Sequence, residues 1–549
     1  MADFIQIYDT TLRDGTQGEG VSFSHADKLN ILQALDSFQI DYVEGGWPGS
    51  NPKDIDFFQA ARDLPLTHTK LTAFGSTCRP QKAPEDDANI QALVSVGTPA
   101  VAIFGKSWKL HVTEVFRTTL DENLRMIEDS VRYVLQQGCE VIYDAEHFFD
   151  GYKDDAPYAI ATLRAALQGG ASCVVLCDTN GGTLPAELGD IFVDVKTQCA
   201  GERVGIHTHN DSGVAIANSL RAVEVGADHV QGTFNGLGER CGNADLTVII
   251  PNLLLKLGRR LSVSADDLGG LSHTARYIHA AANIPFPENE PYVGQMAFAH
   301  KGGVHVNSVM KVSESYEHIT PEAVGNTRRV LISELSGKSN TQYLAFAQGI
   351  DMADHPEAAQ LAVQEIKRLE NEGHVFETAE ASATLIMLKH MGKVPEFFEL
   401  VRYRTAVEHR STGGTFTEAT VKVRVDGEEH LAVGEGVGPV DALDSGLRRA
   451  LSEFYPEIGS IVLNDYRVRI INAQEATHAK VCVTIQSIDK VNDEVWGTVG
   501  ASENIIEASW AALRDSIVYG LLRRRLGLLK GDGSAPNGSV AMEEVSSKR

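Results

Sequence analysis

The feature that most constrains this chain is a regular alternation of short apolar runs and longer helical patterns between residue 4 and about residue 260. The runs are rich in β-branched residues, and their starts fall roughly 25 to 40 residues apart, which leaves room for a strand, a helix and two loops. Eight such runs occur: FIQIYDTTL (4–12), DYVEGG (41–46), LTAFGS (71–76), AVAIFG (100–105), EVIYDAE (140–146), SCVVLCDT (172–179), RVGIHTH (203–209) and DHVQGTF (228–234). Continuous apolar strands joined by helical crossovers predict a parallel sheet covered on both faces.

Helical patterns fill the gaps between the runs, for example at residues 25–38, 121–138 and 213–226. Eight strand-helix units either close into a barrel or spread into an open doubly wound sheet. Both the count and the span of about 260 residues favour closure. We therefore expect an α/β chain that begins with a TIM (β/α)8 barrel.

The later part of the chain changes character. Residues from about 265 to 400 are mostly helical by pattern and include AFAHKGGVHVNS (297–308). Strand alternation starts again beyond STGG (411–414). We expect four parts: a barrel (1–265), a helical linker region (266–405), a C-terminal α+β domain (406–530) and a disordered tail (531–549).

A weak internal repeat lies in the C-terminal α+β domain. Ala-x-Val-x-Val occurs at 419–423 and, in the looser form AKVCV, at 479–483. GEGVG (434–438) recurs as WGTVG (496–500), and a helical pattern follows each. The offset of about 60 residues predicts two copies of a strand, strand, strand, helix unit packed together.

Polar residues end or follow most of the barrel runs, and this placement is informative. The carboxyl ends of all barrel strands converge on one face, so these residues should gather in one cup. They are Arg13 with Asp14, Glu44, Asp144 with Glu146, Asp178 with Thr179, His207 with His209, and Asn235.

A metal site is the sharpest prediction within that cup. Alternate residues of a strand point to one side, so His207 and His209 can face a single ion. Asp14 at the end of the first strand could add a carboxylate, and Asn243 a weaker oxygen. Two histidines and a carboxylate suit a divalent cation, with Mn²⁺, Mg²⁺, Co²⁺ and Zn²⁺ all compatible. The alternatives are unrelated polar residues at a strand end and, for Asn243, stabilisation of its own loop.

Three further features of the cup have a chemical and a structural interpretation. Arg13 could clamp a carboxylate or stabilise an oxyanion, or it could form an ion pair with Glu44 or Glu146. Glu146 could carry a proton, support the metal ligands or form a mouth ion pair. The loop NGLGERCGNA (235–244) follows the eighth strand, where barrels often bind phosphate, but a tight turn also explains its glycines.

Composition excludes some partners. Forty-nine Lys and Arg against 74 Asp and Glu give a net charge of −25, a poor match to nucleic acid or anionic membranes. No run of 18 apolar residues occurs. Seven cysteines without a C-x-x-C pair are typical of reduced, cytosolic usage, so we expect a cytoplasmic protein.

Four motifs, in order along the chain, resemble those of the 2-isopropylmalate synthase and homocitrate synthase family. They are YDTTLRDGTQGEG (8–20), HTHND (207–211), GLGERCGNADL (236–246) and AFAHKGGVHVNS (297–308). The resemblance implies a metal-dependent, acyl-CoA-condensing TIM barrel and continues into a C-terminal amino-acid-sensing domain. It implies that Asp14, His207 and His209 hold the metal, with Asn243 nearby.

The same resemblance implies roles for other residues. Arg13 matches the arginine that polarises a keto group, and Glu146 and Thr179 match substrate-site positions. His305 matches a histidine that acts in the partner subunit's active site, which implies a homodimer, and Tyr316 matches a companion tyrosine. His300 competes with His305 in the same segment and has a structural interpretation.

Two segments, EGGWPGSNPKD (44–54) and VLISELSGKSN (330–340), resemble the citramalate synthase branch more than the 2-isopropylmalate branch. That branch implies condensation of acetyl-CoA with pyruvate, toward isoleucine biosynthesis, with isoleucine or leucine as feedback inhibitor. Condensation with 2-oxoisovalerate, toward leucine, is the alternative substrate choice.

Two rival functions remain at this point. A carbon-carbon lyase of the hydroxymethylglutaryl-CoA lyase kind shares the Asp and His-x-His residues. It would carry a catalytic cysteine in a Gly-Gly-Cys-Pro loop, where this chain has Glu239-Arg240-Cys241-Gly242. A non-enzymatic amino-acid sensor would not need the intact set of Arg13, Asp14, His207, His209 and His305.

Overall fold

The computed structural model describes residues 4–331, 355–409, 414–471 and 479–526, and they fall into two compact units. The first unit comprises Met1–Phe298 and Ile319–Thr327, and the second Ala299–His318 and Arg328–Arg549. The expected tail (531–549) and most of VLISELSGKSN (330–340) lie outside the described residues.

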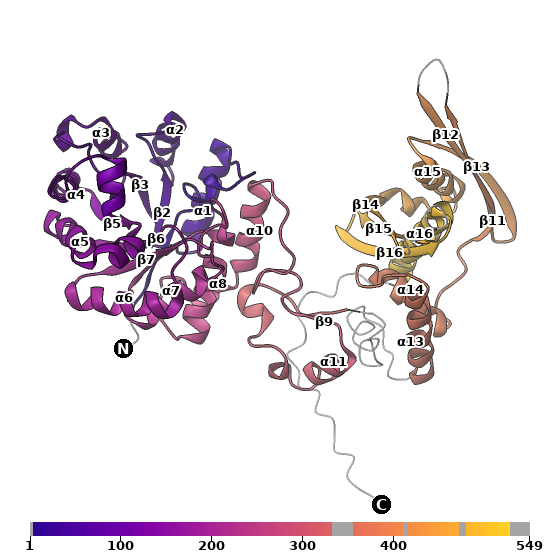
Figure 1. Ribbon diagram of the computed structural model, residues 1–549. Helices are drawn as coiled ribbons and strands as arrows, with labels where there is room; N and C mark the ends of the chain where they lie inside the picture. The colour runs from indigo at the N-terminus through magenta and orange to yellow at the C-terminus, as the bar shows by residue number, and fades with distance from the viewer. Residues whose placement is uncertain (1–3, 332–354, 410–413, 472–478, 527–549) are drawn as a thin grey trace, which may run out of the picture. The chain divides into compact units, whose positions relative to one another are not determined.

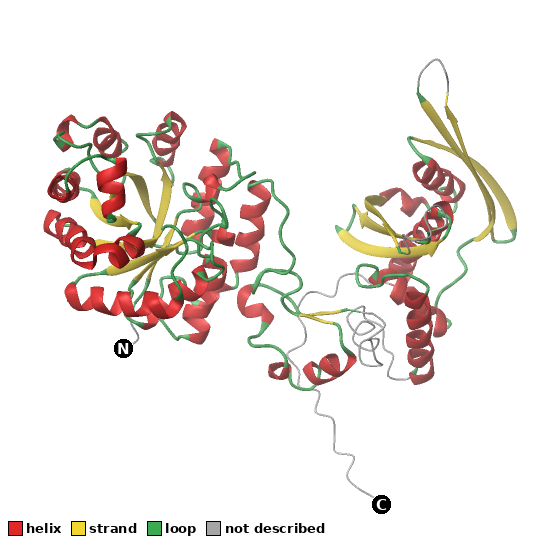
Figure 2. Ribbon diagram, viewed as in Figure 1, coloured by secondary structure: helices red, strands yellow, loops and turns green. Residues whose placement is uncertain are grey.

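The first unit is built around a closed barrel of eight parallel strands in sequential order, which confirms the predicted TIM barrel (Figures 1 and 2). The strands are β1 (Gln6–Asp9), β2 (Tyr42–Gly46), β3 (Lys70–Ser76), β4 (Ala100–Lys106), β5 (Glu140–Glu146), β6 (Cys173–Asp178), β7 (Val204–Thr208) and β8 (His229–Gly232). β8 pairs with both β7 and β1, so the ring closes.

Helices follow the strands and lie outside the barrel (Figure 2). They are α1 (His25–Ser37), α2 (Pro52–Ala61), α3 (Ala88–Ser95), α4 (Leu120–Gln136), α5 (Phe148–Gly169), α6 (Pro185–Gln198), α7 (Ala215–Glu224) and α8 (Leu246–Pro251), with α9 (Ala265–Leu268) and α10 (Leu271–Ala281) after them. Local sequence explains the start of α1, where Ser24 and Asp27 form a reciprocal capping box.

The barrel interior is a packed core and not a channel. Tyr8, Tyr42 and Phe74 form one cluster there with small residues such as Ala102 and Val175. A larger apolar cluster fills the space between strands and helices. Because both faces of each strand are buried, every residue of β6 is buried, and its sequence is a continuous apolar run ending in Asp178.

The second unit contains two similar sub-structures. Each is a three-stranded antiparallel sheet followed by a helix, as the internal repeat predicted. The first comprises β11 (Glu399–His409), β12 (Thr415–Val425), β13 (Glu428–Gly436) and α15 (Pro439–Leu451). The second comprises β14 (Ile461–Ile470), β15 (Val481–Asp489), β16 (Glu494–Ser502) and α16 (Ile505–Leu526).

Short elements precede these sheets in the second unit. They are β9 (Ala299–His300), which pairs in parallel with β10 (Arg329–Val330), then α11 (Gly303–Val309), α13 (Pro356–Asn371) and α14 (Glu380–His390). Among the residues that the structure describes, no helix has the length and apolarity needed to cross a membrane.

Candidate active site

A cavity of about 210 Å³ opens among residues at the carboxyl ends of the barrel strands. Most polar residues that the sequence analysis assigned to the cup line it. The lining residues are Arg13, Asp14, Gln17, Trp47, Phe74, Phe104, Asp144, Glu146, Cys177, Thr179, His207, His209 and Glu239. Asp178 is buried beside the cup but bonds Thr183, and Asn235 bonds the carbonyl of Ala275.

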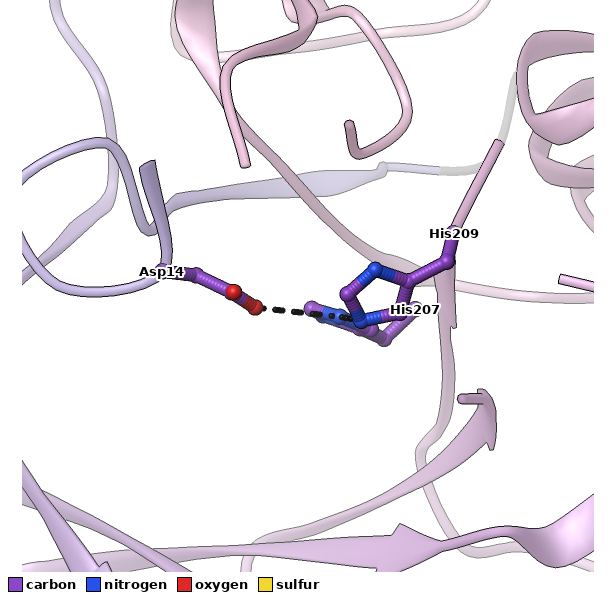
Figure 3. A group of neighbouring side chains, drawn as sticks. All are labelled: Asp14, His207 and His209. Carbon is purple, nitrogen blue, oxygen red and sulfur yellow. Dashed lines mark hydrogen bonds and ion pairs between the residues drawn. The ribbon is translucent and has the colours of Figure 1, made fainter. Parts of the chain in front are cut away.

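Asp14, His207 and His209 form a group able to hold a metal ion (Figure 3). One donor atom from each lies within 4.8 Å of the others. His207 Nε2 is 3.5 Å from Asp14 Oδ2 and 3.4 Å from His209 Nε2. Two nitrogens bound to one cation at about 2.1 Å would themselves lie roughly 3 to 3.4 Å apart, so the spacing fits.

The electrostatics of this group also suit a cation. Burial lowers the pKa of His207, and it lowers the pKa of His209 to about 4, so both rings are neutral and can offer a lone pair. Burial opposes the charge of Asp14, but Arg13 and His207 outweigh it and hold its pKa below the usual range. The group therefore presents two neutral imidazoles and one carboxylate, a donor set that transition metals and Mn²⁺ accept.

Asn243 lies next to the metal-ligating group. Its backbone forms an isolated antiparallel β-bridge with His209, and its side-chain nitrogen donates to the carbonyl of Leu237 at 3.1 Å. Its Oδ1 is buried and has no hydrogen-bond partner within the described residues. Gly238 leaves room for this amide, because a Cβ there would overlap the Asn243 side chain. Within the Gly-rich loop, Gly238 is therefore required where the Asn243 side chain packs.

Arg13 is held in a fixed orientation by three neighbours. Its Nε donates to Glu44, one terminal nitrogen lies 3.4 Å from Asp14, and its guanidinium carbon sits 3.7 Å above the Phe74 ring. Glu44 has no solvent exposure and also accepts from Tyr8 at 2.5 Å. The ion pair to Glu44 that the sequence allowed is present, and the arginine also faces the cavity.

Glu146 and Thr179 line the same cavity. Glu146 forms an ion pair with Lys106 at the end of β4. Thr179 accepts a hydrogen bond at 2.9 Å from the backbone N–H of His147. His147 adopts a left-handed conformation with φ 54°, which turns that N–H toward Thr179. The accepted bond leaves the Thr179 hydroxyl hydrogen free to point elsewhere.

An aromatic wall closes one side of the cavity and was not predicted. Trp47 lies edge-on to Phe74 and Phe104, whose rings stack at 5.2 Å. Asn89 accepts from the Trp47 indole at 2.7 Å and fixes its position. Trp47 belongs to EGGWPGSNPKD, a segment noted above without a role. Only the register of neighbouring strands brings these rings together, and no motif reveals that.

Two buried polar residues were also missed as partners of the ligands. Gln231 contacts His207 at 3.0 Å and Asp144 at 3.0 Å. Burial, with Glu44 nearby, raises the pKa of Asp144 to about 8, so this carboxyl group carries a proton at neutral pH. The alternation of DHVQGTF places Gln231 on the inner face of β8. This is the one feature of the sequence that could have indicated its contact with His207.

His305 and Tyr316 belong to the second unit. Their rings stack at 4.3 Å, and both side chains are exposed, Tyr316 at 47%. His300 is instead engaged by Glu317, which also binds Arg328. Of the two histidines in AFAHKGGVHVNS, His305 therefore presents the exposed ring, whereas His300 has the contacts of a structural residue.

Known proteins match this chain along most of its length. Residues 4–274 match the HMGL-like family, residues 292–374 the homocitrate synthase post-HMGL domain-like family, and residues 377–521 the LeuA allosteric (dimerisation) domain. An (R)-citramalate synthase of Aquifex aeolicus is 52% identical over 95% of this chain and 99% of its own. One of Geobacter sulfurreducens is 47% identical over 94% of this chain and 97% of its own. A probable 2-isopropylmalate synthase of Methanopyrus kandleri is 33% identical over 96% of this chain and 100% of its own.

The barrel has two histidines and an aspartate together in its cup, and a match to the LeuA allosteric (dimerisation) domain follows it. This combination defines the class of enzyme. The chain belongs to the 2-isopropylmalate synthase and homocitrate synthase family. Within that family its sequence groups with the (R)-citramalate synthases, which are 42% to 52% identical to it, more than with the probable 2-isopropylmalate synthases at 28% to 33%.

Proposed function

We propose that this enzyme is an (R)-citramalate synthase, which condenses acetyl-CoA with pyruvate and hydrolyses the resulting thioester. The acetyl group becomes an alkyl group of the product, which makes the enzyme an acyltransferase of that type. The observation that carries the choice of pyruvate is the identity of 42% to 52%, over nearly the full length of the chain, to (R)-citramalate synthases. The packed rings of Trp47, Phe74 and Phe104 beside Arg13 support this choice, because an aromatic wall there favours a keto acid with a small apolar side chain.

Asp14, His207 and His209 would hold the divalent cation, with Asn243 Oδ1 as an additional oxygen donor. When bound, the cation supplies an electron-withdrawing centre that makes the keto carbon of pyruvate electrophilic. The donor set accepts Mn²⁺, Mg²⁺, Co²⁺ or Zn²⁺.

Arg13 would stabilise the negative charge that develops on the keto oxygen during the attack. Glu44 and Asp14 hold the guanidinium with hydrogen bonds and opposite charge, and together they keep its pKa above the usual value despite burial. A preorganised donor of this kind costs no reorientation at the moment of reaction. Thr179 would donate its free hydroxyl hydrogen to the pyruvate carboxylate, and Glu146, held by Lys106, would border the reacting groups.

His305 of a second copy, acting with Tyr316, would remove a proton from the acetyl methyl group. Its exposed position and stacking on Tyr316 support this role, because the ring is available to another chain. In this proposal residues 1–265 are catalytic, residues 266–405 complete the partner's site, and residues 406–530 sense an amino acid and stabilise the dimer.

A second cavity, within the C-terminal repeat, supports the sensing role. It lies between the start of α15 and β14 and is lined by residues that include Pro439, Asp444, Arg448, Leu463 and Tyr466. Apolar and charged groups together suit a branched-chain amino acid such as isoleucine or leucine. Titration of the full-length enzyme with each amino acid by calorimetry tests this, and absence of binding by both would leave the repeat as a dimerisation module.

A reducing compartment fits the cysteines. All seven are free, and six of them are buried. We therefore place the enzyme in the cytoplasm.

Release of CoA from acetyl-CoA with pyruvate, 2-oxoisovalerate and 2-oxoglutarate, measured side by side, tests the proposed reaction. We expect release with pyruvate, much less with the branched keto acid, and none after chelation of the metal. The Asp14→Asn variant is the matched control and should be inactive with all three. Equal or greater release with 2-oxoisovalerate would make leucine biosynthesis the function, and cleavage of hydroxymethylglutaryl-CoA would make the enzyme a lyase.

A further inference from the structure

Gln231 joins a metal-ligating histidine to a buried carboxyl group inside the barrel. It lies on β8 opposite His207 of β7, because the two residues are register partners in the parallel pair. Its side-chain oxygen is 3.0 Å from His207 Nδ1, and its side-chain nitrogen donates to Asp144 Oδ1 at 3.0 Å. Gln231 is 1% exposed, so both contacts are shielded from solvent.

The direction of these hydrogen bonds follows from the chemistry of the groups. A neutral imidazole carries one N–H, so His207 can offer a lone pair at Nε2 only if Nδ1 holds the hydrogen. Nδ1–H then needs an acceptor, and the Gln231 carbonyl is the acceptor in place. The Gln231 amide nitrogen must then find an acceptor of its own. Asp144 supplies one, since a carboxyl group keeps a carbonyl oxygen that accepts even when it is protonated.

We propose that Gln231, anchored by Asp144, is a positioning residue that fixes the tautomer and ring orientation of His207, so that Nε2 faces the divalent cation. The inference rests on the metal site of the proposed function and adds the residues that select its ligand geometry. Partners of this kind, on the far nitrogen of a ligating histidine, strengthen metal binding because they orient the ring and raise its basicity.

His209 provides a contrast within the same site. Its Nδ1 is buried and has no hydrogen-bond partner within the described residues. His207 is therefore the ligand that the barrel holds in advance. Loss of Gln231 would leave both histidines free to adopt the wrong tautomer, which would weaken the site as a whole.

The chain offers a matched control for the experiment. Gln6, on β1, lies 3.4 Å from Nδ1 of another buried histidine, His229. It contacts Arg203 and is not among the residues that line the cavity. Gln6→Met and Gln231→Met each remove one amide from a buried histidine of the barrel, but only the second touches a proposed ligand.

Mn²⁺ affinity of the full-length enzyme, measured by calorimetry without substrate, is the primary readout. We expect Gln231→Met to bind Mn²⁺ about 10- to 100-fold more weakly than wild type, as other partners of ligating histidines do. Gln6→Met should match wild type, and Gln231→Glu should recover most of the affinity because a carboxylate also accepts from Nδ1–H. With saturating Mn²⁺, the turnover number of Gln231→Met should rise toward the wild-type value.

The outcomes distinguish a failure of the Gln231 positioning role from a failure of the proposed metal site. If wild type binds no Mn²⁺, or His209→Ala binds it unchanged, the metal site itself is wrong. If wild type binds Mn²⁺ and folded Gln231→Met binds it equally well, or no more weakly than Gln6→Met does, only the positioning role is overturned. If Gln231→Met does not fold, the Mn²⁺ affinities of Asp144→Leu and Asp144→Asn are compared instead. The asparagine keeps an oxygen that accepts from Gln231 and should retain the affinity, whereas the leucine should lose it.

Discussion

At the scale of single residues, the proposed chemistry depends on Arg13 having a planar fork and not merely a charge. The fork lets one side chain bond Glu44 through Nε, approach Asp14 through a terminal nitrogen and stack on Phe74 at the same time. We expect Arg13→Lys to keep pyruvate binding but to slow the chemical step by about 10²-fold, the usual cost of a lost oxyanion donor. Steady-state kcat together with the pyruvate dissociation constant measures this. Arg125→Lys, which changes a forked arginine on α4, should leave kcat unchanged. A weaker pyruvate complex with normal kcat would reduce Arg13 to a binding residue.

A second residue, His229, should make the barrel sensitive to acid. Burial lowers its pKa to about 3, and its Nε2 has no partner within the described residues. An unfolded histidine has a pKa of about 6.5, so between these values the unfolded chain binds a proton that the folded barrel does not. The contribution of His229 to the free energy of unfolding is thus fully present above about pH 6.5. It falls by about 1.4 kcal/mol per pH unit as the pH drops toward the folded pKa of about 3. The free energy of urea unfolding should fall about 2 kcal/mol less in His229→Asn than in wild type between about pH 6.5 and 5. Parallel losses in the two proteins would show that this ring already titrates when folded.

At this scale the sequence predicted the Asp14, His207 and His209 group that the structure brings together, but not the residues that contact the predicted site residues, Gln231 beside His207 and Lys106 beside Glu146. His207 and His209 stand out because two imidazoles at alternate strand positions are rare and point the same way. Gln231 and Lys106 carry no comparable signal, since a neutral amide or a lysine on a strand fits many roles. Their function appears only when strand register brings β8 beside β7 and β4 beside β5.

At the scale of elements, the eight strands were predictable because most of their residues are buried on both faces and the runs are therefore largely apolar. The ends of the strands were less predictable. The first run was expected at residues 4–12, but β1 ends at Asp9, where the chain turns and Arg13 and Gly15 both donate to the carbonyl of Thr10. That turn delivers Arg13 and Asp14 to the cup. The repeat offset of about 60 residues was also approximate: Gly434 and Ala442 correspond to Gly500 and Ala508, 66 positions later.

These two glycines explain part of the repeat. A Cβ on Gly434 would overlap the backbone of α15 at Ala442 and Gly446, and one on Gly500 would overlap α16 at Ala508. Gly434 lies in β13 and permits close contact between helix and sheet. We expect Gly434→Ala and Gly500→Ala each to cost about 1 to 3 kcal/mol, as overpacking does. Gly459→Ala, where a Cβ meets open space, should be neutral. Urea denaturation monitored by far-UV circular dichroism measures all three, and equal stability would mean that the helices shift freely.

At the scale of the whole molecule, the residues of the proposed reaction are divided between the two compact units. Arg13, Asp14 and the two histidines belong to the first unit, whereas His305 and Tyr316 belong to the second. Residues 377–521 match the LeuA allosteric (dimerisation) domain, and in the proposed reaction the exposed histidine is therefore assigned to the active site of a second copy. In a two-fold dimer each barrel would then receive its His305 from the other chain.

Complementation between two inactive variants tests this arrangement. His305→Ala keeps an intact barrel but supplies no histidine to its partner, and Asp14→Ala supplies the histidine but cannot hold the metal. A mixed dimer therefore contains one complete site, formed by the first chain's barrel and the second chain's His305. Random exchange makes half of the dimers mixed, so activity should recover to about a quarter of the wild-type value. CoA release after refolding the two chains together measures the recovery, with each variant refolded alone as control. If mass spectrometry shows mixed dimers and activity stays absent, His305 serves its own chain's barrel or lies outside catalysis.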